Sequence, residues 1–271
     1  MAALTETEAT RTTNAPVLLR RDEDGVATLT LNRPGARNAL SAGLMARLQE
    51  ALEAIDGDAV IRVVVIAGAG PAFCAGHDLR EIRANPGRAQ YEALFTQCSR
   101  LMQTIVRLRK PVIARVHGIA TAAGCQLVAT CDLAVAADNA RFATPGVNIG
   151  LFCSTPMVAL SRAVGRKAAM EMLLTGDLVT AQEARALGLV NRVVAAADLE
   201  IETMRLAREI AGKSALTLAI GKEAFYRQAE LPLGEAYAYA AETMTRNMLA
   251  RDAEEGIDAF LEKRKPVWRD R

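Results

Sequence analysis

Two apolar runs, each followed by a loop of small residues and then by a helix, constrain the fold of this 271-residue chain more than any other feature. The runs are residues 63–66 and 111–116, and the loops are residues 67–76 and 118–124. The run at residues 63–66 consists of β-branched residues, which is typical of strands that a parallel sheet buries on both faces. Strands that alternate with helices imply right-handed parallel crossovers. We therefore expect an α/β fold.

Apolar periodicity predicts the remaining elements. Two strand-like runs at residues 17–20 and 25–31 flank an acidic turn, which predicts a hairpin. Ser41 is a candidate N-cap for a helix, because leucines and an isoleucine recur every three or four residues after it. Further helices are expected at residues 88–108, from about residue 126, and through most of the chain beyond residue 155. Further strands are expected at residues 132–136 and 189–193.

The predicted organisation is a short tail, a core and a helical region. Residues 1–15 hold too little apolar surface to offset the entropy of ordering, so we expect a disordered tail. The core is predicted to span residues 16–200. Residues 201–271 are predicted to form helices that pack on the core and on a neighbouring subunit. The subunit contact is expected from a helical face formed by Leu231, Leu233, Ala236, Ala240, Met244 and Met248.

Composition excludes several classes of partner. The chain has 33 basic and 31 acidic residues, so we expect neither nucleic acid nor an anionic membrane as a partner. No apolar run reaches the roughly 18 residues of a membrane span. Five cysteines without a C-x-x-C pair, and only two histidines, argue against zinc and against a disulfide framework. The N-terminus has no apolar signal core and carries Glu6 and Glu8, so it resembles neither a secretory signal nor a mitochondrial transit peptide. We therefore expect a cytoplasmic protein with reduced cysteines.

The two small-residue loops are the candidate functional site. Small residues let a ligand approach the backbone closely, and a helix start leaves N–H groups without intrahelical partners. Two such loops side by side can aim two N–H groups at one point. This arrangement is an oxyanion hole, which stabilises the enolate of a thioester as negative charge develops on its carbonyl oxygen. The alternative is that the small residues only allow tight helix–sheet packing.

These loops carry motifs of a known family. The sequence F-C-A-G-H-D-L at residues 73–79 and the sequence V-H-G-I-A-T-A-A-G-C-Q-L at residues 116–127 resemble the two oxyanion-loop motifs of the enoyl-CoA hydratase/isomerase (crotonase) superfamily. The resemblance runs in order from about residue 16 to the end of the chain. The other stretches that carry it are residues 32–40, 131–132, 174–190 and 260–265. Residues 142–156 and 263–268 resemble one branch of the superfamily more specifically.

The resemblance implies a crotonase-like spiral of repeated β-β-α units with a C-terminal helical trimerisation region. It also implies a trimer or a dimer of trimers that binds an acyl-CoA thioester in fatty-acid or other acyl-CoA metabolism. No separate cofactor is expected, because coenzyme A is part of the substrate. The backbone N–H groups of His77 and Ala123 would form the oxyanion hole. The residues that would contact coenzyme A are Arg37, Ala75, Phe260 and Lys263, the last of them across a subunit boundary.

Two positions depart from the hydratase pattern. Hydratases of this superfamily use two glutamates to activate water, and this chain has Gln126 and Gly146 at those positions. An amide cannot take a proton at neutral pH and glycine has no side chain, so general acid–base catalysis, worth roughly 10²–10⁴-fold, is lost. Cys153 and Ser154 lie where other branches place a catalytic Asp, and a thiol there could line the acyl pocket. We therefore expect weak classical hydration.

Several activities stay open at this point. The chain could be an acyl-CoA-binding protein without catalysis, or it could use the enolate for isomerisation, hydrolysis or decarboxylation. A dinucleotide site fails because Phe73 interrupts the G-x-G-x-x-G pattern, and a serine hydrolase lacks G-x-S-x-G. A structural imidazole is favoured over a catalytic one for His77, and a turn position is favoured for His117. Asp78 and Asp132 are expected to cap helices or to hold loops.

Overall fold

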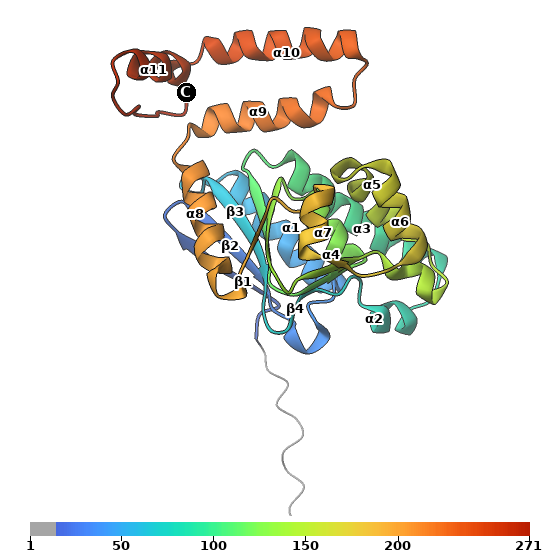
Figure 1. Ribbon diagram of the computed structural model, residues 1–271. Helices are drawn as coiled ribbons and strands as arrows, with labels where there is room; N and C mark the ends of the chain where they lie inside the picture. Colours follow the sequence, from blue (N-terminus) through green and yellow to red (C-terminus); the bar gives the residue numbers. More distant parts are fainter. Residues whose placement is uncertain (1–14) are drawn as a thin grey trace, which may run out of the picture.

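The computed structural model describes residues 15–271, so the predicted tail falls outside the described residues except for its last position. Two sheets form the core (Figure 1). The first has the strand order β1-β2-β3-β5-β7-β10 and is parallel except for the β1–β2 hairpin. Its strands are β1 (Leu18–Glu23), β2 (Val26–Leu31), β3 (Val63–Gly68), β5 (Val112–Val116), β7 (Leu133–Ala137) and β10 (Arg192–Val194). The second sheet contains β4 (Ala72–Cys74), β6 (Ile119–Thr121), β8 (Arg141–Ala143) and β9 (Val179–Thr180).

The chain winds as a spiral in which each turn adds one strand to each sheet and then a helix. The turns are β3 and β4, then β5 and β6, then β7 and β8. The helices of the core are α1 (Ala42–Asp56), α2 (Leu79–Ala84), α3 (Arg88–Arg107), α4 (Ala123–Thr130), α5 (Ser154–Ala163), α6 (Arg166–Thr175), α7 (Ala181–Leu187) and α8 (Leu199–Ala211). Short 3₁₀ segments lie at Pro34–Ala36, Pro145–Ile149 and Ala196–Asp198. The predicted α/β spiral of β-β-α units is therefore confirmed.

The six-stranded sheet is buried on both faces, as its β-branched runs predict. Val64 and Ile66 of β3 face the main core with α1, α3 and α4, while Val63 and Val65 face a smaller core under α8. Figure 1 shows α8 against one face of this sheet, with α1 and α3 on the other side. Helix α8 (residues 199–211) thus packs on the core, and the predicted boundary between the core and the C-terminal helical region, at residue 200, falls within this helix.

Apolar periodicity did not predict the second sheet, although the resemblance to a spiral of β-β-α units implies a second strand in each unit, and this corrects the assignment of the small-residue segments as loops. Residues 72–74 and 119–121 are three-residue strands within the two segments. Strands of only three residues, A-F-C in β4 and I-A-T in β6, are too short to show alternation or a β-branched run, so periodicity could not reveal them.

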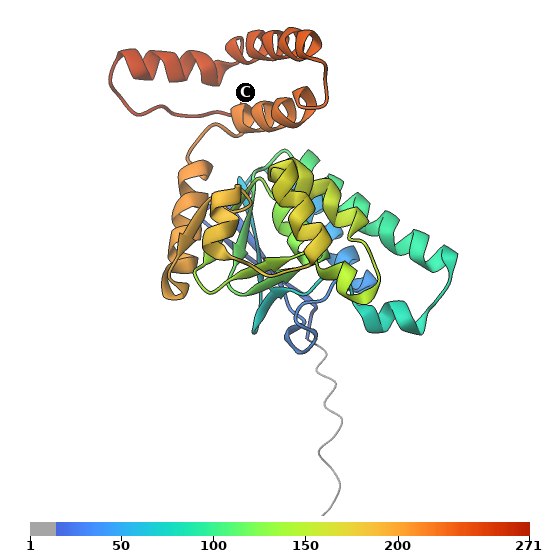
Figure 2. The ribbon, with the colours of Figure 1, turned by 45° about the vertical axis from the view of Figure 1, so that its right-hand side comes forward.

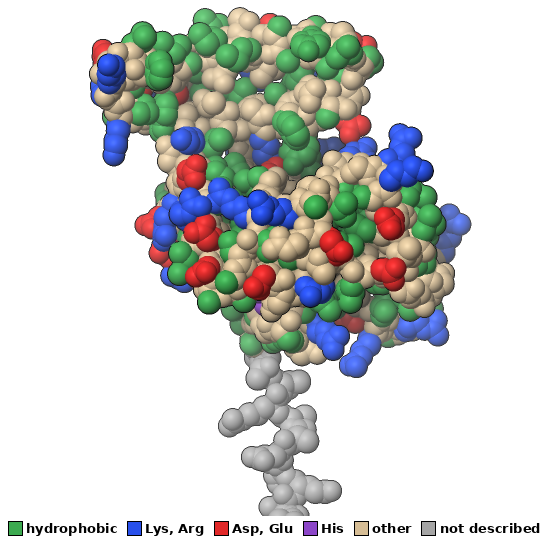
Figure 3. All heavy atoms as spheres, viewed as in Figure 1, with side chains coloured by type: hydrophobic (Ala, Val, Ile, Leu, Met, Phe, Trp, Pro, Cys, Tyr) green, Lys and Arg blue, Asp and Glu red, His purple; other side chains and the backbone are tan. Residues whose placement is uncertain are grey.

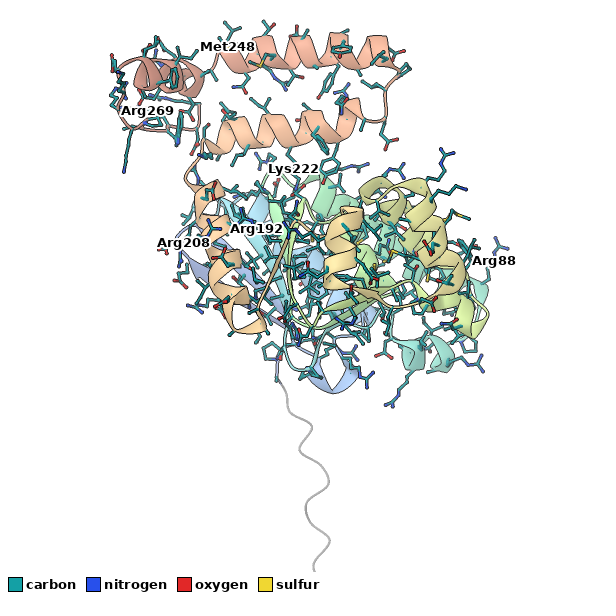
Figure 4. The ribbon with its side chains drawn as sticks, viewed as in Figure 1. Arg88, Arg192, Arg208, Lys222, Met248 and Arg269 are labelled. Atoms are coloured by element: carbon teal, nitrogen blue, oxygen red, sulfur yellow. The ribbon has the colours of Figure 1, made fainter. Side chains whose placement is uncertain are left out.

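Helices α9 (Ala215–Gln228), α10 (Leu233–Met248) and α11 (Arg251–Leu261) form an arm that extends beyond the core (Figures 1 and 2). Lys222 of α9 faces the core (Figure 4), where its Nζ lies 2.7 Å from Asp132 Oδ2. Asp132 also accepts from the Tyr226 hydroxyl at 2.8 Å and from the Val112 amide at 2.7 Å. Asp132 therefore has a structural role, as expected, but it joins α9 to the first residue of β5 instead of capping a helix or holding a loop.

The arm exposes large apolar side chains (Figure 3). Leu233 is 76% exposed and Tyr237 is 72% exposed on α10, where Met244 and Met248 are also exposed. Such exposure exceeds what a folded monomer normally leaves uncovered. No helix among residues 15–271 is long and apolar enough to cross a membrane.

Candidate active site

The second sheet brings the two small-residue loops side by side. Strand β4 pairs in parallel with β6, with Ala72 opposite Ile119 and Cys74 opposite Ala120. The segments that follow the two strands therefore meet. A β-carbon on Gly124 would collide with the Cys74 carbonyl, and one on Gly76 would lie 2.9 Å from the Ala122 β-carbon. The small residues are thus needed for the close approach of the two loops, as well as for packing.

The first candidate donor is the backbone N–H of His77. Leu40 and His77 form a parallel bridge, in which the Leu40 amide donates to the Gly76 carbonyl at 2.7 Å and the Asp78 amide donates to the Leu40 carbonyl at 3.2 Å. In such a bridge the N–H of the middle residue points to the opposite side. The His77 N–H makes no backbone hydrogen bond within residues 15–271. It therefore points away from Leu40 with its hydrogen available.

The second candidate donor is the backbone N–H of Ala123. Ala122 has φ 50° and ψ −118°, a left-handed conformation that turns the chain sharply into α4. The Ala122 amide donates to the Ala143 carbonyl at 2.9 Å, whereas the Ala123 amide is the first of the helix and has no backbone acceptor in the described chain. A β-carbon on Gly76 would lie 3.4 Å from the Ala123 nitrogen. The two available amides therefore lie at neighbouring points of one small space.

Gln126 lies one turn into α4, on the same side as Ala123. Its side chain is buried, with 4% exposed. The Cys98 thiol of α3 lies 3.9 Å from its Oε1 atom. Cys98 was not singled out from the sequence, because only the placement of α3 across α4 reveals this contact. A neutral amide and a thiol therefore face each other at this position, and an amide does not take a proton at neutral pH.

The space beside Gly146 is already filled. A β-carbon on Gly146 would lie 2.5 Å from the Leu151 carbonyl and 2.8 Å from the Cys153 Sγ atom. The structure therefore brings Cys153 against Gly146. Ser154 is exposed instead, and its hydroxyl donates to the Phe152 carbonyl at 3.3 Å. Burial raises the pKa of the Cys153 thiol, so the thiolate is not favoured.

Two of the four predicted coenzyme A contacts lie at the loops. The Ala75 amide donates to the Arg37 carbonyl at 3.0 Å, which joins the segment after β2 to the first small-residue loop. The Arg37 side chain is exposed. Phe260 and Lys263 lie at the end of α11 on the arm, where Phe260 is 82% exposed. Within this chain the arm stands apart from the loops (Figure 2), so these two residues are not brought to the same site by one copy.

The side chains beside the first loop have distinct environments. Asp78 caps α2 through the amides of Arg80 and Glu81, and the Arg33 guanidinium at 2.8 Å lowers its pKa. This confirms the predicted capping role. His117 Nε2 lies 2.8 Å from the Gly70 carbonyl, as expected of a turn histidine. The His77 ring packs edge-on against Phe95 of α3, with ring centroids 5.8 Å apart. Residues 15–271 contain no cluster of metal-ligating side chains.

Comparisons with known proteins agree with this geometry. The family model described as "Enoyl-CoA hydratase/isomerase" matches residues 21–271. The chain belongs to this family. It is 50% identical over 250 residues to the human "Enoyl-CoA hydratase domain-containing protein 3, mitochondrial", covering 92% of this chain and 82% of that protein. This similarity confirms the more specific resemblance carried by residues 142–156 and 263–268.

Two solved structures of the enoyl-CoA hydratase/isomerase family show the same fold. An enoyl-CoA hydratase from Mycobacterium smegmatis is 58% identical, with a TM-score of 0.92, covering 94% of this chain and 99% of that one. The human enoyl-CoA hydratase domain-containing protein 3 is 48% identical, with a TM-score of 0.91, and the match covers 93% of this chain and 100% of that one.

The names of the relatives correct one prediction. The human protein and its mouse, rat, Xenopus and zebrafish counterparts are all named as mitochondrial. The prediction of a cytoplasmic protein was therefore wrong. It relied on cysteine usage, which does not distinguish the cytoplasm from another reducing compartment, and on an N-terminus whose Glu6 and Glu8 argued against a mitochondrial transit peptide.

Proposed function

We propose that this protein binds acyl-CoA thioesters with the thioester carbonyl held by the backbone amides of His77 and Ala123. The neighbouring positions of these two amides are the observation that carries the proposal. Neither amide has a backbone acceptor, and a fixed pair of N–H donors stabilises an oxyanion without reorganisation. Coenzyme A arrives as part of the substrate, and the proposal involves no other cofactor. The names of the relatives suggest acyl-CoA metabolism, of fatty acids among others.

We infer that water addition to an enoyl thioester is slow. Gln126 can hold a water through its amide but cannot take its proton. The space at Gly146 is occupied by the Leu151 carbonyl and the Cys153 thiol, so no second carboxylate faces the site from there. The retained amide pair supports an enolate-forming reaction such as isomerisation, hydrolysis or decarboxylation, because a protein that only binds thioesters has no need to stabilise an enolate.

The proposed contacts with coenzyme A are Arg37 and Ala75 of one subunit and Phe260 and Lys263 of another. The exposed apolar face of α10 supports a trimer or a dimer of trimers. In such an assembly the arm of one copy can deliver Lys263 to the loops of the next. Phe260 is almost fully exposed in the single chain, which fits a residue that a neighbouring subunit covers.

The proposal is tested with a panel of enoyl-, hydroxyacyl- and malonyl-type CoA thioesters, with calorimetry for binding and mass spectrometry for products. Binding of the thioesters without rapid formation of hydroxyacyl product is expected. A mass change other than hydration would identify the enolate reaction. Binding with no product from any of these thioesters would favour the second candidate, a non-catalytic acyl-CoA-binding protein. Failure of every thioester to bind would contradict the proposed function.

A further inference from the structure

Asn38 is a buried asparagine with a left-handed backbone, in the segment between β2 and α1. Its φ is 55°, and the preceding residue, Arg37, has φ 49°. Asn38 is inaccessible to solvent, whereas Arg37 is exposed. Residues other than glycine rarely adopt this conformation, and asparagine does so more readily than most. Two such residues in succession persist only where neighbouring contacts hold the backbone in place.

The side chain of Asn38 supplies such contacts. Its Oδ1 atom accepts from the Arg33 amide at 2.9 Å, and its Nδ2 atom donates to the carbonyls of Ala69 and Ala72 at 2.8 and 2.7 Å. The backbone amide of Asn38 also donates to the Arg33 carbonyl at 2.9 Å. These bonds close residues 33–38 into a turn and fix this turn to the connection between β3 and β4. An amide suits this place, because it accepts and donates hydrogen bonds at the same time.

The segment that contains Asn38 orients the His77 N–H. Residues 37–40 make three backbone hydrogen bonds with residues 75–78, at 3.0, 2.7 and 3.2 Å. Leu40 makes two of them, one to the residue before His77 and one from the residue after it. These bonds leave the His77 N–H on the side away from Leu40. The side chain of Asn38 therefore fixes the segment that holds the first small-residue loop.

Arg33 makes a second attachment between the turn and this loop. Its guanidinium donates to the Ala39 carbonyl at 2.5 Å and to Asp78 Oδ2 at 2.8 Å. Asp78 directly follows His77, so the ion pair holds the loop next to the candidate donor. The Arg33 amide is itself bound by Asn38 Oδ1, and loss of the asparagine side chain therefore loosens both attachments.

We propose that Asn38 is a positioning residue for the oxyanion hole: its buried amide fixes residues 37–40, and these aim the His77 N–H at the thioester oxygen. The inference rests on the proposed function. Asn38 does not touch the thioester and acts only through the backbone of His77. A charged enolate oxygen gains more from a well-aimed N–H than a neutral carbonyl does. Loss of Asn38 should therefore weaken enolate stabilisation more than it weakens thioester binding.

A probe that ionises to an enolate tests this role. Acetoacetyl-CoA is a 1,3-dicarbonyl thioester that loses an α-proton to the buffer, and its enolate absorbs in the near ultraviolet. The full-length wild-type protein should raise the ionisation constant of the bound probe above that of the free probe, because the two amides stabilise the enolate oxygen. Asn38→Ser removes the side-chain amide without adding charge. It should lower the ionisation constant of the bound probe about tenfold, since loss of one complete donor costs roughly 10²–10³-fold.

Two further variants and a second ligand complete the experiment. Asn32→Ser is the matched control and should behave as the wild type, because the Asn32 side chain donates to the Pro16 carbonyl at 2.8 Å instead of to the β3–β4 connection. Calorimetry should show that Asn38→Ser binds butyryl-CoA almost as tightly as the wild type, because this thioester keeps a neutral carbonyl. Asn38→Gly is the second variant if the serine variant misfolds, because glycine adopts the left-handed conformation without strain.

The failure of the positioning role and the failure of the proposed function give different results. If the wild-type protein binds neither thioester, or leaves the ionisation constant of acetoacetyl-CoA unchanged, the proposed function fails. If the wild type raises this constant and the Asn38 variants keep the wild-type value, Asn38 does not position the donor. Equal losses of butyryl-CoA affinity and of enolate stabilisation would also overturn the positioning role, because they would indicate a general loosening of the site.

Discussion

The Ala123 amide nitrogen lies 3.4 Å from the position that a β-carbon on Gly76 would occupy. Gly76 also has φ +96°, a conformation that residues with side chains rarely adopt. Two requirements therefore meet at one residue: the left-handed backbone that directs the His77 N–H, and the close contact between the two loops. Any side chain at this position is expected to separate the two donors.

Gly76→Ala should lower the free energy of unfolding by about 1–3 kcal/mol, because of backbone strain and of the contact with the Ala122 β-carbon. It should also weaken thioester binding. Gly43→Ala is the control, because Gly43 lies in α1 with open space around its β-carbon position, and it should leave the protein as stable or more stable. Urea unfolding of both variants checks this. Equal stability and equal binding in Gly76→Ala and the wild type would contradict the proposed hole.

Restoring the hydratase carboxylates should fail on steric grounds. Gly146→Glu places a β-carbon 2.5 Å from the Leu151 carbonyl, a backbone atom that cannot rotate away. The variant should therefore lose about 1–3 kcal/mol of stability, as overpacked cores do. Combination with Gln126→Glu should leave crotonyl-CoA hydration close to that of Gln126→Glu alone. A stable double variant that hydrates rapidly would show that this segment can rearrange.

Replacement of Lys263 tests the proposed contact between subunits. Lys263→Ala should weaken binding of coenzyme A thioesters up to about fivefold at low salt, since an exposed charge pair is worth roughly 0–1 kcal/mol. It should also reduce the salt dependence of binding, because one screened charge pair is lost. Lys265→Ala is the neighbouring control. Calorimetry at two salt concentrations on the assembled oligomer decides the matter, and an unchanged affinity at low salt would remove Lys263 from the site.

Acid should release the segment that follows α11. Glu255 accepts from Arg264 at 2.6 Å and from the Val267 amide at 2.7 Å, and these bonds lower its pKa to about 2. Because the pKa of Glu255 is lower in the folded state than in the unfolded state, these bonds stabilise the folded protein fully above pH 4.5. This stabilisation is lost as pH falls towards about 2. The stability difference between Glu255→Gln and the wild type should therefore shrink over this range. Glu254→Gln is the control, and a pH-independent difference for Glu255→Gln would contradict the contact.

The sequence predicted the parts of the fold that leave a long periodic signal. The buried runs of β3 and β5 and the apolar face of α1 were identified because each spans several residues with one regular pattern. Periodicity missed strands β4 and β6 because three residues are too few to show a period, although these strands bring the two loops together. Family motifs identified Gln126 and Gly146, yet no motif could show which atoms surround them.

Contacts between distant segments were beyond sequence reasoning. Phe95 meets His77 and Cys98 meets Gln126 only because α3 crosses the loops at a particular angle, which the spacing within α3 does not determine. The environment of the His77 ring is likewise a property of packing. The motif identifies residue 77 as a backbone donor, but it does not show that the ring packs against Phe95 of α3.

The central claim is that this member of the enoyl-CoA hydratase/isomerase family holds a thioester in its oxyanion hole without the carboxylates that add water. The most direct test is the loss of absorbance of the conjugated enoyl thioester when wild-type protein is mixed with crotonyl-CoA under conditions where calorimetry shows binding. We predict binding with a hydration rate at least about 100-fold below that of a two-glutamate hydratase measured alongside, because the general acid–base contribution is missing. Rapid loss of absorbance by the wild-type protein would contradict the claim and would show that another group activates water.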